Sequence, residues 1–157
     1  MQGFGAPNKT NNSNSSSESS SNGMGGGRRL QQDMSINWID QNKVHPVKNQ
    51  GSCGSCWAFA AATVQESMQA IKNDAPVVRL SEQEGVDCDS RSYGCSGGWM
   101  SNYWRMSAEI GSSSNEAYKY EAKDSACRNQ QNKTIVSRAN EGSIKMVRYW
   151  EMKEQLQ

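Results

Sequence analysis

Residues 50–57 read Gln50-Gly51-Ser52-Cys53-Gly54-Ser55-Cys56-Trp57, and a helical pattern follows them directly. Apolar residues recur at steps of four, three, four and three, at Trp57, Ala61, Val64, Met68 and Ile71. This spacing predicts an amphipathic helix with that face toward the core, and with Gln65, Glu66, Gln69 and Lys72 toward solvent. Ser55 is a favourable N-cap type, and Asn73-Asp74-Ala75-Pro76 predicts the end of the helix.

Cys56 falls in the first turn of this predicted helix. Unpaired backbone N–H groups and the positive end of the helix dipole favour an anion at that point. A thiolate is such an anion, and it is the nucleophilic form of cysteine. The local sequence therefore predicts a reactive thiol at residue 56.

Residues 1–33 form an Asn/Ser/Gly-rich tract with almost no apolar side chains. Such a tract buries too little surface to offset its ordering entropy, so we expect it to be disordered. Residues 34–157 are expected to form one folded unit with a modest core. A net charge of +1 with interspersed signs argues against a nucleic-acid or anionic-membrane surface. No apolar run approaches the length of a membrane span, and no signal peptide is visible at the N-terminus.

The chain has five cysteines, an odd count that suggests paired structural cysteines and one reactive thiol, with several pairings open. Disulfides persist in oxidising compartments, but no export signal is visible. We expect that the true N-terminus is missing or misassigned. The alternative is a chain that is not exported and whose cysteines stay reduced. Asn8, Asn11, Asn14 and Asn132 begin Asn-X-Ser/Thr glycosylation motifs, and the first three carry little weight because their tract is Asn/Ser-rich.

Further elements are expected after the central helix. Ser81 and Glu84 have the spacing of a capping box, which predicts a short helix to about Cys88 that Gly85 interrupts. A third helix is predicted over residues 99–110, with Met100, Tyr103, Trp104 and Ala108 inward and Gly111 as its stop. Short strands are predicted over residues 134–137 and 143–147, and a helix over 151–157.

Cys53-Gly54-Ser55-Cys56-Trp57 resembles the signature of the papain-like cysteine proteases. The resemblance continues through residues 80–84 (LSEQE), 86–88 (VDC) and 93–98 (YGCSGG), and fades towards Gln157. It implies the α+β papain-like fold, truncated to the mainly helical left domain, so that residues 34–157 would be the N-terminal half of a peptidase domain. The β-rich C-terminal half would then be absent from this sequence.

The resemblance also implies the roles of individual residues. Cys56 would be the nucleophile, and its backbone N–H and the Gln50 side chain would form the oxyanion hole. Gly97 and Gly98 would pair with an extended substrate, and Trp99 and Met100 would lie near the pocket for the second residue before the cut bond. The implied disulfides are Cys53–Cys95 and Cys88–Cys127, which leave Cys56 free. Polypeptide substrates and proteinaceous cysteine-protease inhibitors are the implied partners, with a lysosomal or extracellular location and neither cofactor nor metal.

His45 is the only histidine in the chain, and we expect it to be structural or solvent-facing. The protease histidine comes roughly 130–150 residues after the nucleophile, which from Cys56 lies beyond Gln157. We therefore expect a cysteine-type peptidase that is incomplete and inactive as this chain. The alternative is a non-catalytic papain-like relative that acts as a binding or decoy module, or a gene-model fragment.

Two other readings of the cysteines are open. Cys53 and Cys56 have the C-x-x-C spacing of a thiol–disulfide oxidoreductase, but the polar residues 48–51 precede them where a buried strand is needed. Mapping the disulfides separates the two readings, because a redox pair would join Cys53 to Cys56. A zinc site is disfavoured because the chain has neither a second C-x-x-C nor a histidine pair.

Overall fold

In the computed structural model, the described residues are 36–128, 131–145, 147–148 and 151–152. They contain, in chain order, α1 (Cys56–Lys72), α2 (Glu82–Cys88), the 3₁₀ turn η1 (Gly94–Ser96), α3 (Met100–Ile110) and the 3₁₀ turn η2 (Glu141–Ser143). The tract over residues 1–33 and most of the helix predicted over 151–157 lie outside the described residues. No helix among the described residues combines the length and the apolar character needed to cross a membrane.

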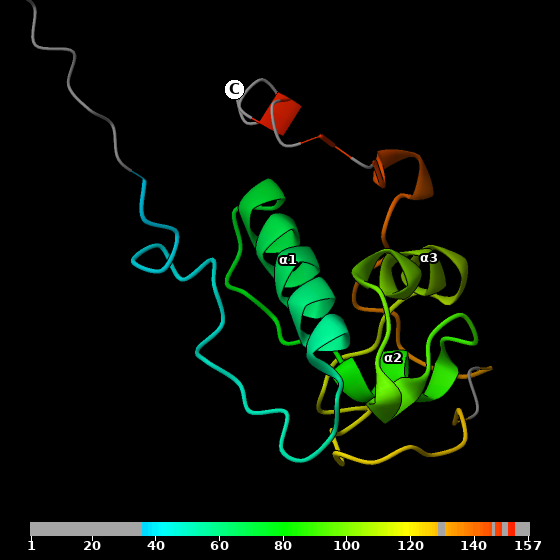
Figure 1. Ribbon diagram of the computed structural model, residues 1–157. Helices are drawn as coiled ribbons and strands as arrows, with labels where there is room; N and C mark the ends of the chain where they lie inside the picture. Colours follow the sequence, from blue (N-terminus) through cyan, green and yellow to red (C-terminus); the bar gives the residue numbers. More distant parts are fainter. Residues whose placement is uncertain (1–35, 129–130, 146, 149–150, 153–157) are drawn as a thin grey trace, which may run out of the picture. The chain divides into compact units, whose positions relative to one another are not determined.

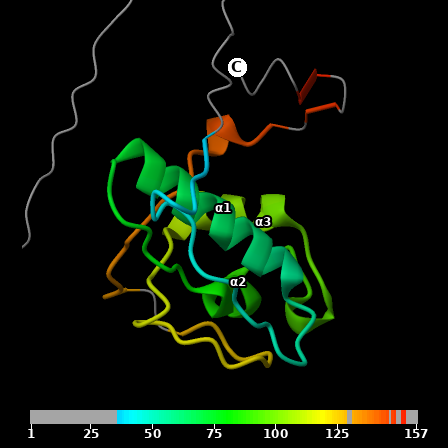
Figure 2. The same cartoon turned by 90° about the vertical axis from the view of Figure 1, so that its left-hand side faces the viewer.

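The long helix α1 is the centre of the arrangement (Figure 1). It packs against both α3 and α2, and these two shorter helices also contact each other. The segment that leads from residue 36 to α1 runs along the other side of α1, away from α3, as the turned view shows (Figure 2). The apolar core lies between the three helices and consists of Trp57, Ala58, Ala61, Ala62, Leu80, Val86, Tyr103 and Met106.

The bounds of α1 agree with the prediction, but its predicted inward face is wrong in its C-terminal half. Val64 and Met68 are exposed, and Ile71 is 36 % exposed, whereas Gln65 and Glu66 are buried. The polar pair is buried because each side chain has partners inside: Gln65 donates to the hydroxyls of Ser107 and Ser137, both at 2.8 Å. Buried polar groups are tolerated when they are hydrogen-bonded in this way.

Helix α2 begins where the capping pattern places it. The hydroxyl of Ser81 accepts the backbone N–H of Glu84 at 2.9 Å, as an N-cap does. The Glu84 carboxylate does not complete the box; it accepts from the backbone N–H and the hydroxyl of Ser113 and pairs with Lys133 at 2.8 Å. The glycine at position 85 makes room for the Tyr103 ring, because a Cβ at Gly85 would lie 2.5 Å from the Cδ2 atom of that buried ring.

Helix α3 ends as predicted at Gly111, whose φ of +76° suits glycine. Its inward residues differ in part from the prediction, since Tyr103 and Met106 are buried but Met100 is 44 % exposed. The strands predicted over 134–137 and 143–147 are wrong for the described residues. Ser137 makes only an isolated antiparallel bridge with Ser112, and Ser143 belongs to η2. A single bridge leaves neighbouring backbone groups without the ladder that defines a strand.

Candidate active site

Cys56 is the first residue of α1, and its thiol is exposed and outside any disulfide. The preceding residue, Ser55, occupies the N-cap position, but its side chain makes no capping bond. Instead the buried Ser55 hydroxyl lies 2.6 Å from the Tyr120 hydroxyl. The first-turn N–H groups are therefore not capped by Ser55, and the Cys56 sulfur stands in solvent at the positive end of the helix.

Gln50 is held next to the start of α1 by two hydrogen bonds. The side-chain amide of Gln50 donates to the backbone carbonyl oxygen of Cys53 at 2.9 Å. The backbone carbonyl oxygen of Gln50 accepts from the Tyr120 hydroxyl at 2.7 Å. A primary amide carries two N–H donors, so a second one remains beside the first. The Tyr120 ring also packs edge-on against Phe59 of α1, with the ring centroids 4.8 Å apart.

No role was assigned to Tyr120 from the sequence. The structure makes it a connection between the Gln50 loop and the beginning of α1, through Gln50 and Ser55. A phenol hydroxyl that both donates and accepts is suited to join two such segments. The signal in the sequence was the aromatic residue itself, but nothing in its spacing pointed to residue 50.

The glycine loop that contains Gly97 and Gly98 is fastened against the same helix end. The disulfide Cys53–Cys95 joins it to the segment before α1, and the Trp57 indole donates to the Gly94 carbonyl oxygen at 3.1 Å. A Cβ at Gly98 would lie 2.6 Å from two ring atoms of Trp57, so only glycine permits this approach. Gly97 has φ +123°, which also favours glycine.

Trp99 and Met100 follow the loop and present their side chains to solvent. Trp99 is 72 % exposed, and it stands just before the first residue of α3. Two exposed apolar side chains in sequence beside a glycine loop offer apolar surface for a ligand.

A buried charge cluster, Lys48 with Glu66 and Glu82, fixes the segment that leads to Gln50. The Lys48 ammonium lies 2.6 Å from one Glu66 oxygen and 2.8 Å from Glu82. All three side chains are buried, and Glu66 also accepts the backbone N–H of Leu80 at 2.8 Å. The cluster joins the segment before α1, α1 itself and α2, and sequence reasoning missed it because it placed Glu66 on the solvent face.

His45 lies in the extended segment before Gln50, where it is half-buried. Its Nδ1 atom is 3.0 Å from the carbonyl oxygen of Pro46. Over the described part of the chain, no group of three or more His, Cys, Asp or Glu side chains is placed to hold a metal ion.

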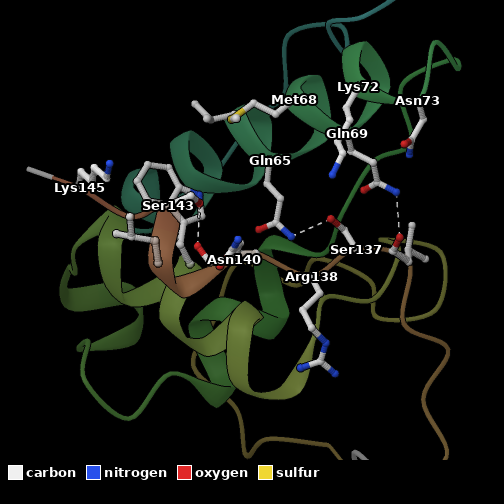
Figure 3. A pocket seen from close by; sticks show the side chains of 15 residues that line it. Gln65, Met68, Gln69, Lys72, Asn73, Ser137, Arg138, Asn140, Ser143 and Lys145 are labelled. Carbon is white, nitrogen blue, oxygen red and sulfur yellow. Dashed lines mark hydrogen bonds between the residues drawn. The ribbon is translucent and has the colours of Figure 1, made fainter. Parts of the chain in front are cut away.

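A cavity of about 650 Å³ lies elsewhere, between α1 and the segment over residues 136–145 (Figure 3). Gln65 and Gln69 point from α1 into it, and their amides donate to Ser137 and to the Val136 carbonyl oxygen. Neither Cys56 nor Gln50 nor the glycine loop lines this cavity. The exposed Val64 and Met68, which the sequence pattern assigned to the core, are among the residues that line it.

Both disulfides have the pairing that the resemblance implied, Cys53–Cys95 and Cys88–Cys127. The reading of Cys53 and Cys56 as a redox pair is therefore wrong for this structure. A free thiol at the first residue of a helix is an arrangement found in the class of enzymes that use a cysteine nucleophile.

The comparisons with known proteins agree with that class. The model of the papain family cysteine proteases matches residues 33–157, so this chain belongs to the papain family. It is 45 % identical over 94 residues to chymopapain of Carica papaya, covering 60 % of this chain and 26 % of that protein. It is 43 % identical over 102 residues to procathepsin L of Rattus norvegicus, covering 63 % and 30 %.

A solved structure shares the fold. The structure of the bromelain protease from Ananas comosus in complex with the E64 inhibitor superposes with a TM-score of 0.61 at 36 % identity, covering 66 % of this chain and 47 % of that chain. The described helices are thus the helical part of a papain-like fold. This chain spans less than half the length of each of these three relatives.

Proposed function

We propose that this chain carries the nucleophile half of a cysteine peptidase that hydrolyses polypeptides through an acyl-enzyme. The thiolate of Cys56 attacks the carbonyl carbon of a peptide bond and forms an oxyanion intermediate. Departure of the amine leaves a thioester, which water hydrolyses. The observation that carries the proposal is the exposed, unpaired Cys56 at the first residue of α1 in a chain of the papain family.

The oxyanion is assigned to the backbone N–H of Cys56 and to the Gln50 side-chain amide. Gln50 is supported for this role by its two hydrogen bonds, which hold it beside the residues that precede α1. One amide hydrogen is used on the Cys53 carbonyl oxygen, and the other is left to donate. A preorganised donor of this kind lowers the barrier by about 3–4 kcal/mol.

Substrate binding is assigned to the glycine loop and the two residues after it. The backbone of Gly97 and Gly98 pairs with an extended substrate, since no side chain stands in the way at those positions. Trp99 and Met100 contribute apolar surface for the second residue before the cut bond. A relative, the bromelain protease, is known in complex with the E64 inhibitor, which supports ligand binding by this fold.

The general base is assigned to residues outside this sequence. The only histidine, His45, precedes the nucleophile and contacts Pro46. Without a base and acid, proton delivery to the leaving amine is slow, and a helix dipole does not replace it. We therefore expect the 157-residue chain to turn over peptide amides only weakly. Because the sequence has one histidine and it precedes the nucleophile, a second candidate is also favoured, namely a non-catalytic relative that binds peptides or inhibitors.

The proposed setting is a lysosome or the exterior of the cell, with polypeptide substrates and proteinaceous cysteine-protease inhibitors as partners. Two disulfides in the fold support an oxidising compartment. Procathepsin L among the relatives supports the same setting by resemblance.

A pair of electrophiles tests the proposal. The chain is incubated with a dipeptide chloromethyl ketone and, in parallel, with chloroacetone, which carries the same electrophile without a peptide portion. We expect Cys56 to react faster with the peptidyl reagent, and the Cys56→Ala variant to react with neither. Equal rates for the two reagents would mean that no substrate-binding surface adjoins the thiol. Substantial turnover of a fluorogenic dipeptide amide would contradict the assignment of the base to residues outside this sequence.

A further inference from the structure

The segment that follows Cys127 presents one of the four glycosylation motifs on the surface of the fold. Asn132, Lys133 and Thr134 form the motif, and residues 131–132 lie in a turn. The other three motifs begin at Asn8, Asn11 and Asn14, outside the described residues. Among the four acceptors, Asn132 is the one that lies in the described residues.

Over residues 131–135, Lys133 is turned toward the body of the protein, whereas its neighbours are exposed. Lys133 is turned inward, where its ammonium donates to a Glu84 carboxylate oxygen and to the Gly111 carbonyl oxygen, both at 2.8 Å. Ile135 touches the Gly111 backbone, since a Cβ at Gly111 would come within 2.7 Å of its side chain, but it is 47 % exposed. Asn132 and Thr134, on either side of Lys133, are exposed.

The inward anchor at Lys133 is strong. Its side chain is 9 % exposed, and its partner Glu84 is fully buried. A buried ion pair of this kind holds the register, because rotating the segment by one residue would bury Asn132 and leave Glu84 without its cation. The acceptor amide and the hydroxyl two residues later are thereby kept on the solvent side.

There is also room beside the acceptor. A hollow of about 380 Å³ adjoins Asn132 and Thr134, with Ala117, Tyr118 and Arg128 among its lining residues. Asn132 is thus exposed and borders open space. N-linked glycans are bulky and need such a surface position.

We propose that Asn132 is an N-glycosylation site. The side-chain amide nitrogen attacks the anomeric carbon of a lipid-linked oligosaccharide, forms the C–N bond, and displaces the polyprenyl diphosphate. The proton lost from the nitrogen passes to a base of the transferase. The reaction requires passage of the chain through the secretory compartment, which the Cys53–Cys95 and Cys88–Cys127 bridges also require. It is independent of peptidase activity.

The test uses the full chain behind a cleavable secretion leader in insect cells. Asn8, Asn11 and Asn14 are replaced by Gln in the test background, so that Asn132 is the remaining acceptor. Translocated chains from cells and medium, identified by leader removal, are analysed by glycopeptide mass spectrometry. We expect a glycopeptide at Asn132 that an N-glycan amidase converts to the aspartate form.

Matched variants separate glycosylation from other effects on the segment. Asn132→Gln and Thr134→Ala are expected to abolish the glycopeptide, whereas Thr134→Ser keeps the motif and is expected to keep the glycan. A translocated chain with an unmodified Asn132 overturns the proposal. So does a glycan found only on chains that lack the Cys88–Cys127 bridge, because the position would then be modified only in unfolded protein.

Discussion

Replacing Lys48 with methionine removes the one cation that two fully buried carboxylates share. The Lys48 ammonium lies 2.6 and 2.8 Å from the two oxygens of Glu66, and 2.8 Å from Glu82. Methionine preserves much of the side-chain length and its packing, but it offers neither charge nor donor. The substitution therefore isolates the electrostatic part of the cluster.

The loss of stability in Lys48→Met depends on which partners each carboxylate keeps. Glu82 retains Arg79 at 3.1 Å, whereas Glu66 retains, among the described residues, the neutral backbone N–H of Leu80. One buried negative charge is thus left uncompensated. Breaking a buried ion pair by removing one partner costs about 3–5 kcal/mol, which is a large share of a total stability of about 5–15 kcal/mol.

Urea unfolding followed by far-ultraviolet circular dichroism measures this loss, with both disulfides kept oxidised. Lys43→Met is the matched control, because the Lys43 partner, Asp74, has a side chain that is 97 % exposed. The control should cost no more than about 1 kcal/mol. The double variant Lys48→Met with Glu66→Gln should recover part of the loss, since a neutral amide needs no cation.

A Lys48→Met variant as stable as the Lys43→Met variant would refute the reasoning. It would mean that the Glu66 carboxylate is protonated or reached by water in the folded chain. In either case the cluster would not be what holds the Gln50 segment against α1 and α2.

Two further changes test the packing and the titration of buried groups. Gly85→Ala should lower the free energy of unfolding by about 1–3 kcal/mol, despite the better helix propensity of alanine, because the new methyl group would lie 2.5 Å from the Tyr103 ring. Gly142→Ala is its control, with no neighbouring atom nearer than 3.5 Å, and a stabilised Gly85→Ala chain would contradict the packing. Burial raises the pKa of Tyr118 to about 12, with further contributions from the Asp87 carboxylate. Because the folded state favours the neutral phenol, its contribution to stability is present below about pH 10 and is lost as the pH rises from there through about 12. Titration of phenolate absorbance should show a late tyrosine that is absent from Tyr118→Phe, and an unchanged titration curve in that variant would oppose the assignment.

The helices could be predicted from the sequence, but the environment of their faces could not. Steps of three and four placed the central helix within one residue of its observed start, and the Ser81 signal placed α2. The same periodicity put Val64 and Met68 inside, because it counts apolar residues without knowing what packs against them. Alanines make the contact instead, since Ala58, Ala61 and Ala62 allow α2 and α3 a close approach.

Long-range polar contacts account for most of what sequence reasoning missed. Lys48 and Glu66 are 18 residues apart, and Tyr120 reaches Gln50 across 70 residues. No local rule couples residues at such separations. Thr134, Ile135 and Val136 are β-branched, which favours a strand, but the described residues offer the run a single bridge at Ser112 rather than a partner strand.

The candidate site was located through the resemblance more than through local rules. Helix physics indicated a reactive thiol at Cys56, and an odd cysteine count indicated one free thiol. The cysteine count left the pairing of the other four cysteines open, and the family resemblance supplied that pairing. The roles of Gln50, Gly97, Gly98, Trp99 and Met100 remain predictions that the experiments above address.

Alkylation of the unreduced chain with iodoacetamide, followed by peptide mapping, tests the central claim most directly. The account predicts rapid modification of Cys56 and of no other cysteine, with Cys53–Cys95 and Cys88–Cys127 recovered as intact bridges. Recovery of Cys56 in a disulfide, or its failure to react while another cysteine does, would contradict it.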